Sequence, residues 1–173
     1  MDLILFFLLL ICFVFALFAF SLSISFFLGP PFVPTPKYIV QEMLDLINIS
    51  EKDILLDLGS GDGAILIEAA KRGTYSVGYE INPFLTFLTK LKARINRVHK
   101  NIEIHTQSYQ KADMRNATIV FCYNLPKFMI SVSKKIKKEL PENSRVVSYK
   151  FPIRGLTLVT KTKSGIFLYK VTK

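Results

Sequence analysis

Cysteine and histidine are scarce in this sequence, and their scarcity excludes two kinds of protein. Among 173 residues the two cysteines are Cys12 and Cys122, and the two histidines are His99 and His105. The cysteines fall in separate apolar runs, so no disulfide framework is expected. The histidines have no cysteine or carboxylate at ligand spacing, so we predict no metal site. A chain of this length leaves room for one domain of about 100 to 150 residues.

Charged residues are missing from the N-terminal segment. Residues 3–28 carry none, and all 23 basic residues follow them, beginning with Lys37. As a helix this run of 28 − 3 + 1 = 26 residues would extend about 39 Å, beyond the ~30 Å of a bilayer core. A secretory signal is the alternative, but it would need a basic start, a shorter core and an Ala-x-Ala-like site. We expect a single-pass transmembrane anchor over residues 1–29, with the C-terminal domain on the cytoplasmic side, or the matrix side in a mitochondrion.

A short proline-rich linker over residues 30–36 is expected to join this anchor to a domain over residues 37–173. Because a chain advances at most ~3.6 Å per residue, we expect the domain to lie close to the membrane and its partners to lie in or on it. Residues 90–173 hold 19 basic and 4 acidic residues, which favours contact with anionic lipid. Nucleic acid is not an expected partner, because no aromatic-basic stacking motif accompanies the charge. The oligomeric state is left open.

The domain alternates apolar strand-like runs with amphipathic stretches, which is typical of an α/β fold with a mostly parallel sheet. The last two runs are separated by Ser164-Gly165 and predict an antiparallel hairpin. We expect strands over residues 54–58, 75–79, 102–106, 118–123, 144–151, 156–163 and 166–172.

A glycine-rich turn, Asp57-Leu58-Gly59-Ser60-Gly61-Asp62-Gly63, follows the first of these strands and leads into an apolar helix over residues 64–71. Strand, glycine turn and helix together predict a nucleotide site, because glycines let a ligand approach the backbone and the helix N-terminus offers free N–H donors. Glu80 follows the next strand, 80 − 59 = 21 residues after Gly59. At this spacing an acidic residue accepts hydrogen bonds from the ribose hydroxyls.

Two cofactors compete for this turn, because Gly59, Gly61 and Ala64 also satisfy the G-x-G-x-x-G/A pattern of dinucleotide sites. A dinucleotide would bring a diphosphate beside Asp57 and Asp62, with no Lys or Arg in the turn to offset them. Like charges ~5 Å apart at an effective dielectric constant near 20 cost about 3 kcal/mol per pair. The turn therefore favours S-adenosylmethionine, which carries an ammonium group and no phosphate.

This turn, together with Glu80, resembles the cofactor signature of class I S-adenosylmethionine-dependent methyltransferases. In order and spacing, further segments resemble the small membrane-anchored protein-lysine methyltransferases, a group that acts on the ATP synthase c-subunit and the adenine nucleotide translocase. The resemblance implies a Rossmann-like sheet of seven strands and methylation of a lysine in a membrane protein. It is carried by Pro34-Thr35-Pro36, the glycine turn, Gly78-Tyr79-Glu80-Ile81-Asn82-Pro83, Leu125-Pro126 and Arg145-Val146-Val147-Ser148.

The resemblance also implies which residues bind the cofactor. The family usually has an Asp at the adenine, where this chain has Gln107 and Ser108. Gln107 can still accept and donate hydrogen bonds there, and its alternative role is that of an ordinary loop residue. The predicted cofactor-binding residues are Asp57, Gly59, Ser60, Gly61, Gly63, Glu80, Ile81, Asn82, Gln107, Ser108 and Asn124.

The predicted acceptor site lies after the fourth strand. Asn124, with Pro126 two residues on, resembles in part the Asn/Asp-Pro-Pro-aromatic turn of amino-group methyltransferases, although Leu125 and Lys127 depart from it. We predict Asn124, Tyr123 and Pro126 as catalytic residues. Thr35 and Tyr38 would contact the substrate; their alternatives are a helix cap and a surface aromatic residue.

The function expected from the sequence is S-adenosylmethionine-dependent methylation of a protein lysine. Two alternatives stay open: a lipid or quinone acceptor, and a non-catalytic S-adenosylmethionine-binding adaptor of a membrane complex.

Overall fold

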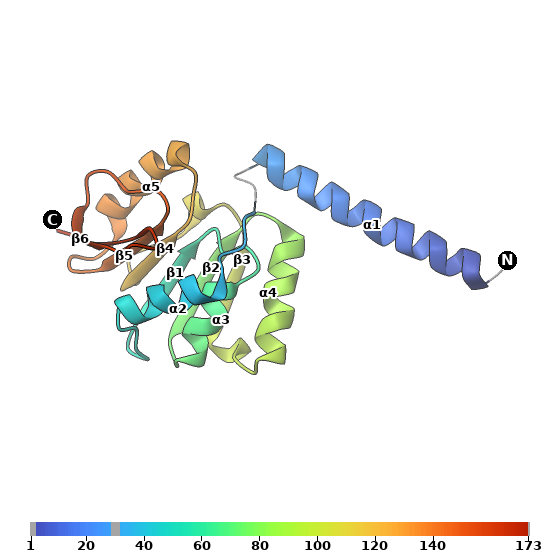
Figure 1. The fold of residues 1–173 in the computed structure, drawn as a ribbon, viewed down its shortest axis with the longest axis horizontal. Helices are drawn as coiled ribbons and strands as arrows, with labels where there is room; N and C mark the ends of the chain where they lie inside the picture. Colours follow the sequence, from blue (N-terminus) through green and yellow to red (C-terminus); the bar gives the residue numbers. More distant parts are fainter. Residues whose placement is uncertain (1–2, 29–31, 173) are drawn as a thin grey trace.

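The computed structural model describes residues 3–28 and 32–172, and it describes the side chains of residues 3–16 and 32–172. Its centre is a seven-stranded sheet in the order β3-β2-β1-β4-β5-β7-β6 (Figure 1). The strands are β1 Ile54–Leu58, β2 Tyr75–Glu80, β3 Ile102–Thr106, β4 Ile119–Cys122, β5 Arg145–Tyr149, β6 Thr157–Lys161 and β7 Ile166–Lys170.

The first five strands pair in parallel, with β1 next to both β2 and β4. In the central strands nearly every residue is buried, because helices cover both faces and leave no side for water. The last strand, β7, runs antiparallel between β5 and β6. The predicted mostly parallel sheet with a C-terminal antiparallel hairpin is confirmed.

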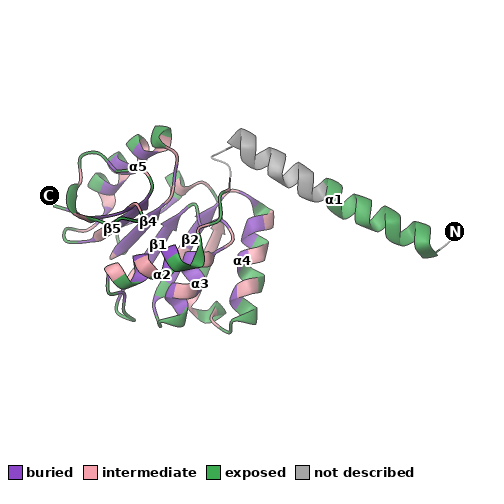
Figure 2. Cartoon of the chain, viewed as in Figure 1, coloured by how far each residue is buried: buried purple, intermediate pink, exposed green. Residues whose placement is uncertain are grey.

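The helices α2 Lys37–Leu46, α3 Ala64–Lys71, α4 Pro83–Ile95 and α5 Pro126–Glu139 flank the sheet. Two apolar clusters result, one on each face (Figure 2). In one, Met43 of α2 and Leu66 of α3 pack with Phe121 of β4. In the other, Val132 and Ile136 of α5 pack with Val120 of β4. Alternate residues of one strand thus enter opposite layers, as the pleat requires.

Strand boundaries differ slightly from those expected, and one difference affects the site. The fourth strand ends at Cys122, so Tyr123 and Asn124 lie in the loop beyond the paired region.

The start of helix α2 also differs from the expectation. The N-cap of α2 is Pro36, with no side-chain cap hydrogen bond. Thr35 therefore does not cap this helix, and its side chain is free for another role.

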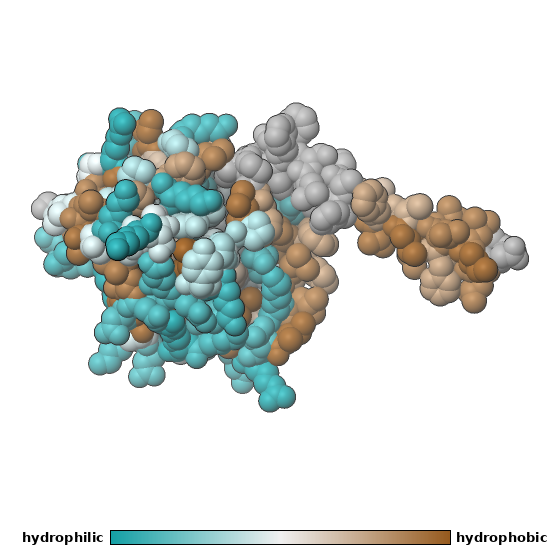
Figure 3. Space-filling model, viewed as in Figure 1, coloured by the Kyte–Doolittle hydropathy of each residue, from teal (hydrophilic) through white to brown (hydrophobic). Residues whose placement is uncertain are grey.

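The N-terminal helix α1, Leu3–Leu28, contacts α4 and projects from the α/β domain (Figure 1). The described side chains of α1 are exposed and hydrophobic, whereas hydrophilic residues dominate the visible face of the domain (Figure 3). Among the residues that the structure describes, no helix combines the length and the apolar character needed to cross a membrane. This finding corrects the predicted transmembrane anchor and, with it, the predicted membrane localisation with the C-terminal domain on the cytoplasmic or matrix side.

The predicted linker lies partly outside the described residues, since 29–31 are not described. Residues 32–36 adopt neither helix nor strand and lead directly into α2. The division of the chain at residues 29 and 36 stays a prediction.

Candidate functional site

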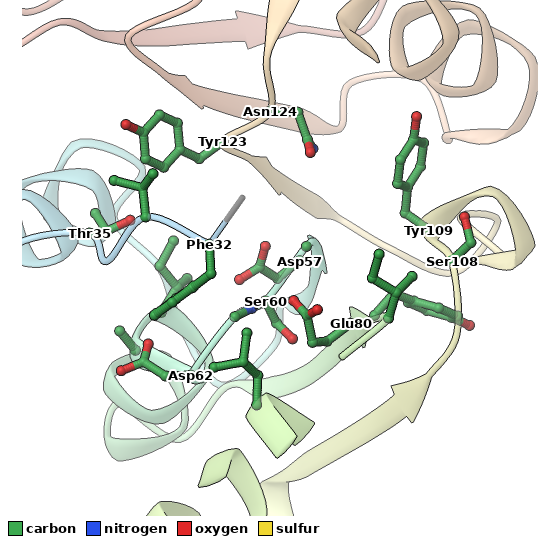
Figure 4. Close-up of a pocket in the computed structure, with 18 of the residues that line it drawn as sticks. Phe32, Thr35, Asp57, Ser60, Asp62, Glu80, Ser108, Tyr109, Tyr123 and Asn124 are labelled. Atoms are coloured by element: carbon green, nitrogen blue, oxygen red, sulfur yellow. Dashed lines mark hydrogen bonds between the residues drawn. The ribbon is translucent and has the colours of Figure 1, made fainter. Parts of the chain in front are cut away.

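A pocket opens where β1, β2 and β4 end (Figure 4). Strand β1 contributes Asp57, the turn after it contributes Ser60, β2 contributes Glu80, and the loop after β4 contributes Asn124. These strands are parallel neighbours, so their carboxyl ends meet at one edge of the sheet, which is where α/β folds bind ligands.

The glycine turn has the backbone shape that its sequence predicts. Gly59, Gly61 and Gly63 have φ values of 119°, 54° and 77°, a region that side chains disfavour. A Cβ on Gly61 would lie 2.5 Å from Cε2 of Phe32, and one on Gly63 would lie 2.4 Å from Cγ2 of Thr89. Both glycines are therefore needed for close packing as well as for backbone conformation.

Glu80 joins β2 to this turn. Its Oε2 accepts a hydrogen bond from the Gly61 N–H at 2.9 Å, and its Oε1 accepts one from the Asn82 N–H at 2.8 Å. Burial raises the pKa of Glu80, and the backbone N–H groups partly oppose that rise. Each oxygen keeps acceptor capacity and the carboxylate faces the cavity (Figure 4), so Glu80 can accept hydrogen bonds from two neighbouring hydroxyl groups.

Asp57 is buried at the end of β1, with 4% of its surface exposed. Burial, and then the nearby carboxylates of Glu80 and Asp62, raise its pKa to about 8. No ion pair in the described part of the chain involves Asp57. A cationic group bound beside it would favour the ionised form and reverse this rise, so the site is suited to an ammonium.

The charge of Asp62 is offset, contrary to expectation. Lys92 of α4 forms an ion pair with Asp62, thirty positions from it in the sequence. The sequence disfavoured a diphosphate because Asp57 and Asp62 both had no basic residue nearby. The ion pair of Asp62 with Lys92 reduces that repulsion. Asp57 and Glu80 still place two buried carboxyl groups in the pocket without a basic partner among the described residues.

Asn124 connects the ends of β4 and β1. Its Nδ2 donates a hydrogen bond to the Leu58 carbonyl at 2.8 Å, and the buried side chain points into the cavity (Figure 4). The amide oxygen is therefore the part of Asn124 available to a ligand. Ser60 Oγ also lines the pocket, and it is buried without a hydrogen-bond partner among the described residues. An unpartnered buried hydroxyl of this kind fits a bound polar ligand.

The pocket brings together most of the predicted site residues. Besides Asp57, Ser60, Glu80 and Asn124, the lining includes these predicted residues: Thr35, Gly59, Gly61, Ile81, Ser108 and Tyr123.

The other predicted residues do not line the pocket, and local structure gives each another position. Asn82 accepts hydrogen bonds from Phe84 N and Leu85 N and thereby caps α4. Gly63 is the N-cap of α3, and Pro126 is in the first turn of α5. Gln107 is exposed at the end of β3, and Tyr38 is 66% exposed on α2.

Several lining residues were not predicted. Tyr109 and Gln110, in the short helical turn after β3, line the end of the pocket where Gln107 was expected. Phe32 lies opposite Tyr109, across the cavity (Figure 4), and Phe128 of α5 completes the lining. Tyr109 follows the parallel strand β3, and this position could have suggested it as a site residue. No sequence signal identified Phe32.

Comparisons with known proteins agree with this geometry. A sequence model described as the ANTKMT methyltransferase domain matches residues 57–160. The chain is 32% identical to the ATP synthase c-subunit lysine N-methyltransferase of Homo sapiens, over 79% of the chain and 58% of that protein. It is 36% identical to a protein-lysine N-methyltransferase of Saccharolobus islandicus, over 72% of the chain and 79% of that protein.

Among solved structures, an RNA methyltransferase from Salinibacter ruber in complex with S-adenosyl-L-homocysteine superposes with a TM-score of 0.75. Its sequence is 34% identical, and the match covers 81% of this chain and 93% of that one. The chain spans little more than half the length of the Homo sapiens relative.

The seven-stranded Rossmann-like sheet, the glycine turn and Glu80 define a methyltransferase fold whose cofactor is S-adenosylmethionine. More particularly, the chain belongs to the family of the ANTKMT methyltransferase domain, and its match to this family begins at Asp57. Both conclusions agree with the resemblance seen in the sequence.

Proposed function

We propose that this chain is an S-adenosylmethionine-dependent protein-lysine N-methyltransferase and that its substrate is a membrane protein. The observation that carries the proposal is the pocket itself. It combines an acidic glycine turn and Glu80 with the amide of Asn124 at the end of β4. Relatives named for lysine methylation support the choice of acceptor.

The residues of the pocket fit the cofactor. Glu80 would accept hydrogen bonds from the ribose hydroxyls, and the positive-φ glycines would admit the ligand against the backbone. The carboxyl of Asp57 would favour the ammonium of the methionine portion, and Ser108 and Tyr109 would lie at the adenine end. When bound, S-adenosylmethionine supplies an electrophilic methyl group on a sulfonium.

The chain's own part in the reaction is to orient the acceptor and keep it neutral. A lysine with a pKa near 10.4 costs about 4.6 kcal/mol to deprotonate at pH 7, and a partly dry pocket lowers that cost. The Asn124 side chain is fixed through Nδ2, so its Oδ1 can accept a hydrogen bond from the amine without reorganising. Holding the nucleophile in line in this way is the main source of rate in such a transfer.

The proposal is tested by binding and by labelling. Isothermal titration of the purified full chain with S-adenosylhomocysteine should give saturable heat, and NAD should give none. Incubation with methyl-labelled S-adenosylmethionine and a membrane extract should place label on protein, recovered as methyl-lysine after hydrolysis. Binding of NAD alone would contradict the cofactor, and label confined to extracted lipid would contradict the acceptor.

RNA is a second candidate acceptor, favoured by one comparison and one surface. The Salinibacter ruber structure, 34% identical over most of both chains, is described as an RNA methyltransferase. Helix α5 of this chain exposes Lys134, Lys137 and Lys138, which could contact phosphates. Adding total RNA to the labelling reaction separates the two acceptors, because label resistant to protease and sensitive to ribonuclease would establish RNA.

A further inference from the structure

One lysine of the chain itself, Lys150, contacts an aromatic ring that lines the pocket. The Nζ atom of Lys150 is 5.4 Å from the ring centroid of Tyr149 and 5.8 Å from that of Tyr123. The two rings contact each other edge to face, with centroids 5.0 Å apart. Tyr123 lines the pocket, so the cation rests against a ring that also forms the pocket wall.

Asn124 and Lys150 lie in the loops that follow two neighbouring strands, β4 and β5. Cys122 of β4 pairs with Ser148 of β5, and Asn124 and Lys150 each lie two residues beyond that pair. Neighbouring strands are about 4.8 Å apart, and a lysine side chain reaches about 6 Å from its Cα. The lysine side chain is therefore longer than the separation of the two strands that these loops follow.

The backbone of Lys150 is fixed by a hydrogen bond, and its side chain is exposed. Its φ is +62°, a left-handed conformation that a lysine rarely adopts. The Lys150 N–H donates to the Gly165 carbonyl at 2.9 Å, which fixes this turn against the hairpin. The side chain is exposed, and none of the ion pairs among the described residues involves it.

The contacts that hold the ammonium are weak. Cation–π contacts at exposed sites contribute little, and exposed side chains change rotamer in nanoseconds or less. A hydrogen bond with the Tyr123 hydroxyl, which also raises the pKa of Lys150 above its ordinary value, is solvent-exposed as well. The Tyr123 hydroxyl points away from Asn124 (Figure 4), so Lys150 must rotate across the ring to enter the pocket.

We propose that Lys150 is a site of self-methylation, modified by the pocket of its own chain. The proposal rests on the proposed function, since it uses the same cofactor and the same acceptor side of the pocket. Lys150 Nζ first leaves its contact with the Tyr123 hydroxyl and gives up a proton to solvent. Its lone pair then forms the new nitrogen–carbon bond as the sulfur–methyl bond breaks, and that bond's electron pair stays on sulfur, leaving S-adenosylhomocysteine.

Methylation would leave Lys150 at the same place. A methylated amine of this kind is protonated at neutral pH and keeps its attraction to the faces of Tyr123 and Tyr149. It has fewer N–H donors for the Tyr123 hydroxyl. The tyrosines would therefore retain the modified side chain against Tyr123, which lines the pocket.

The test needs no external acceptor. The purified full chain is incubated with S-adenosylmethionine, and its intact mass and peptides are followed by mass spectrometry. We expect mass increases of one or more methyl groups that map to Lys150. The rate per chain should be independent of protein concentration, because the reaction occurs within one molecule.

Matched variants identify the lysine. Lys150→Arg should lose the modification. Lys161→Arg should keep it, because Lys161 also lies over an aromatic ring, that of Phe167 at 5.2 Å, but on β6, away from the pocket. Binding of S-adenosylhomocysteine by both variants shows that they are folded.

Three results would overturn the inference. One is modification of Lys127, whose Nζ lies 4.9 Å from the ring of the pocket residue Phe128, in place of Lys150. The second is a rate per chain that rises with protein concentration. The third is an unmodified chain that binds S-adenosylhomocysteine and labels other proteins, a result that leaves the proposed function intact. A chain that neither binds the cofactor nor labels anything would contradict both.

Discussion

Glu80 and Gly61 are joined by a hydrogen bond of 2.9 Å from the glycine N–H to the carboxylate Oε2. The bond ties the end of β2 to the turn after β1, so two parts of the cofactor site are positioned by one side chain. Because the carboxylate both shapes the turn and faces the cavity, a change at Glu80 acts on ligand binding directly.

Glu80→Gln should weaken cofactor binding. The amide keeps one acceptor oxygen but loses the charge, and hydrogen bonds to charged groups contribute about 1 kcal/mol more than neutral ones. Lost at one or at both ribose hydroxyls, this difference should raise the Kd for S-adenosylhomocysteine, measured by titration calorimetry, about 5- to 30-fold. Glu68→Gln is the control, since Glu68 pairs with Lys71 on α3 and does not line the pocket. An unchanged Kd in Glu80→Gln would show that this carboxylate does not contact the ligand.

Asn124→Ala should reduce methyl transfer far more than cofactor binding. The variant removes the fixed amide oxygen proposed to orient the amine, and loss of positioning costs about 100-fold in rate. It also leaves the buried Leu58 carbonyl without its donor, which lowers the free energy of unfolding by about 1 to 3 kcal/mol. Single-turnover labelling and denaturant unfolding measure the two effects.

The control for this variant is Asn116→Ala, which changes an exposed asparagine in a turn. A labelling rate unchanged in Asn124→Ala, with S-adenosylhomocysteine still bound, would show that the Asn124 amide does not orient the acceptor amine.

Without bound cofactor, the titration of Asp57 should lower the free energy of unfolding as the pH rises. Folding raises its pKa from 3.8 to about 8, so between these values the folded chain holds a proton that the unfolded chain has lost. The contribution to stability is therefore fully present below about pH 4 and is lost as the pH rises through about 8.

Asp57→Asn should remove this dependence. Its free energy of unfolding, measured by urea titration between pH 5 and 8, should fall less steeply with pH than that of the wild type, by at most about 1.4 kcal/mol per pH unit. Asp45→Asn is the control, because Asp45 is an exposed aspartate on α2. Parallel pH profiles for the wild type and Asp57→Asn would contradict a raised pKa at this position.

The sequence predicted the centre of this site well because the rule behind it is local. Asp57, Glu80 and Asn124 lie within two residues of the end of a recognisable strand. Parallel strands bring their ends together whatever the loops do. The loops themselves were not predictable. A short helical turn after β3 exposes Gln107 and turns Ser108 and Tyr109 toward the cavity, and no residue pattern marks that choice.

Contacts between distant segments were missed for a related reason. Lys92 offsets Asp62 only because α4 packs beside the glycine turn, and Phe32 covers Gly61 only because the segment before α2 crosses the pocket. Each depends on tertiary packing between residues about thirty positions apart. The transmembrane anchor was predicted from the apolar composition of residues 3–28 alone. Composition of this kind predicts a helix but does not determine what surrounds it.

Gly61→Ala should be much more harmful than the same change at Gly165. Both glycines have positive φ, 54° and 83°, so both substitutions carry a backbone cost of about 1 kcal/mol. Only Gly61 adds a clash, since its Cβ would lie 2.5 Å from the Phe32 ring, whereas no atom lies within 4 Å of a Cβ on Gly165.

We expect Gly61→Ala to lower the free energy of unfolding by about 1 to 3 kcal/mol more than Gly165→Ala, and to weaken S-adenosylhomocysteine binding as well. The double variant Phe32→Ala, Gly61→Ala should recover the part of the loss that comes from the clash, because the ring is then absent. Equal losses in Gly61→Ala and Gly165→Ala, measured by urea unfolding, would show that Phe32 does not lie against the glycine turn in solution.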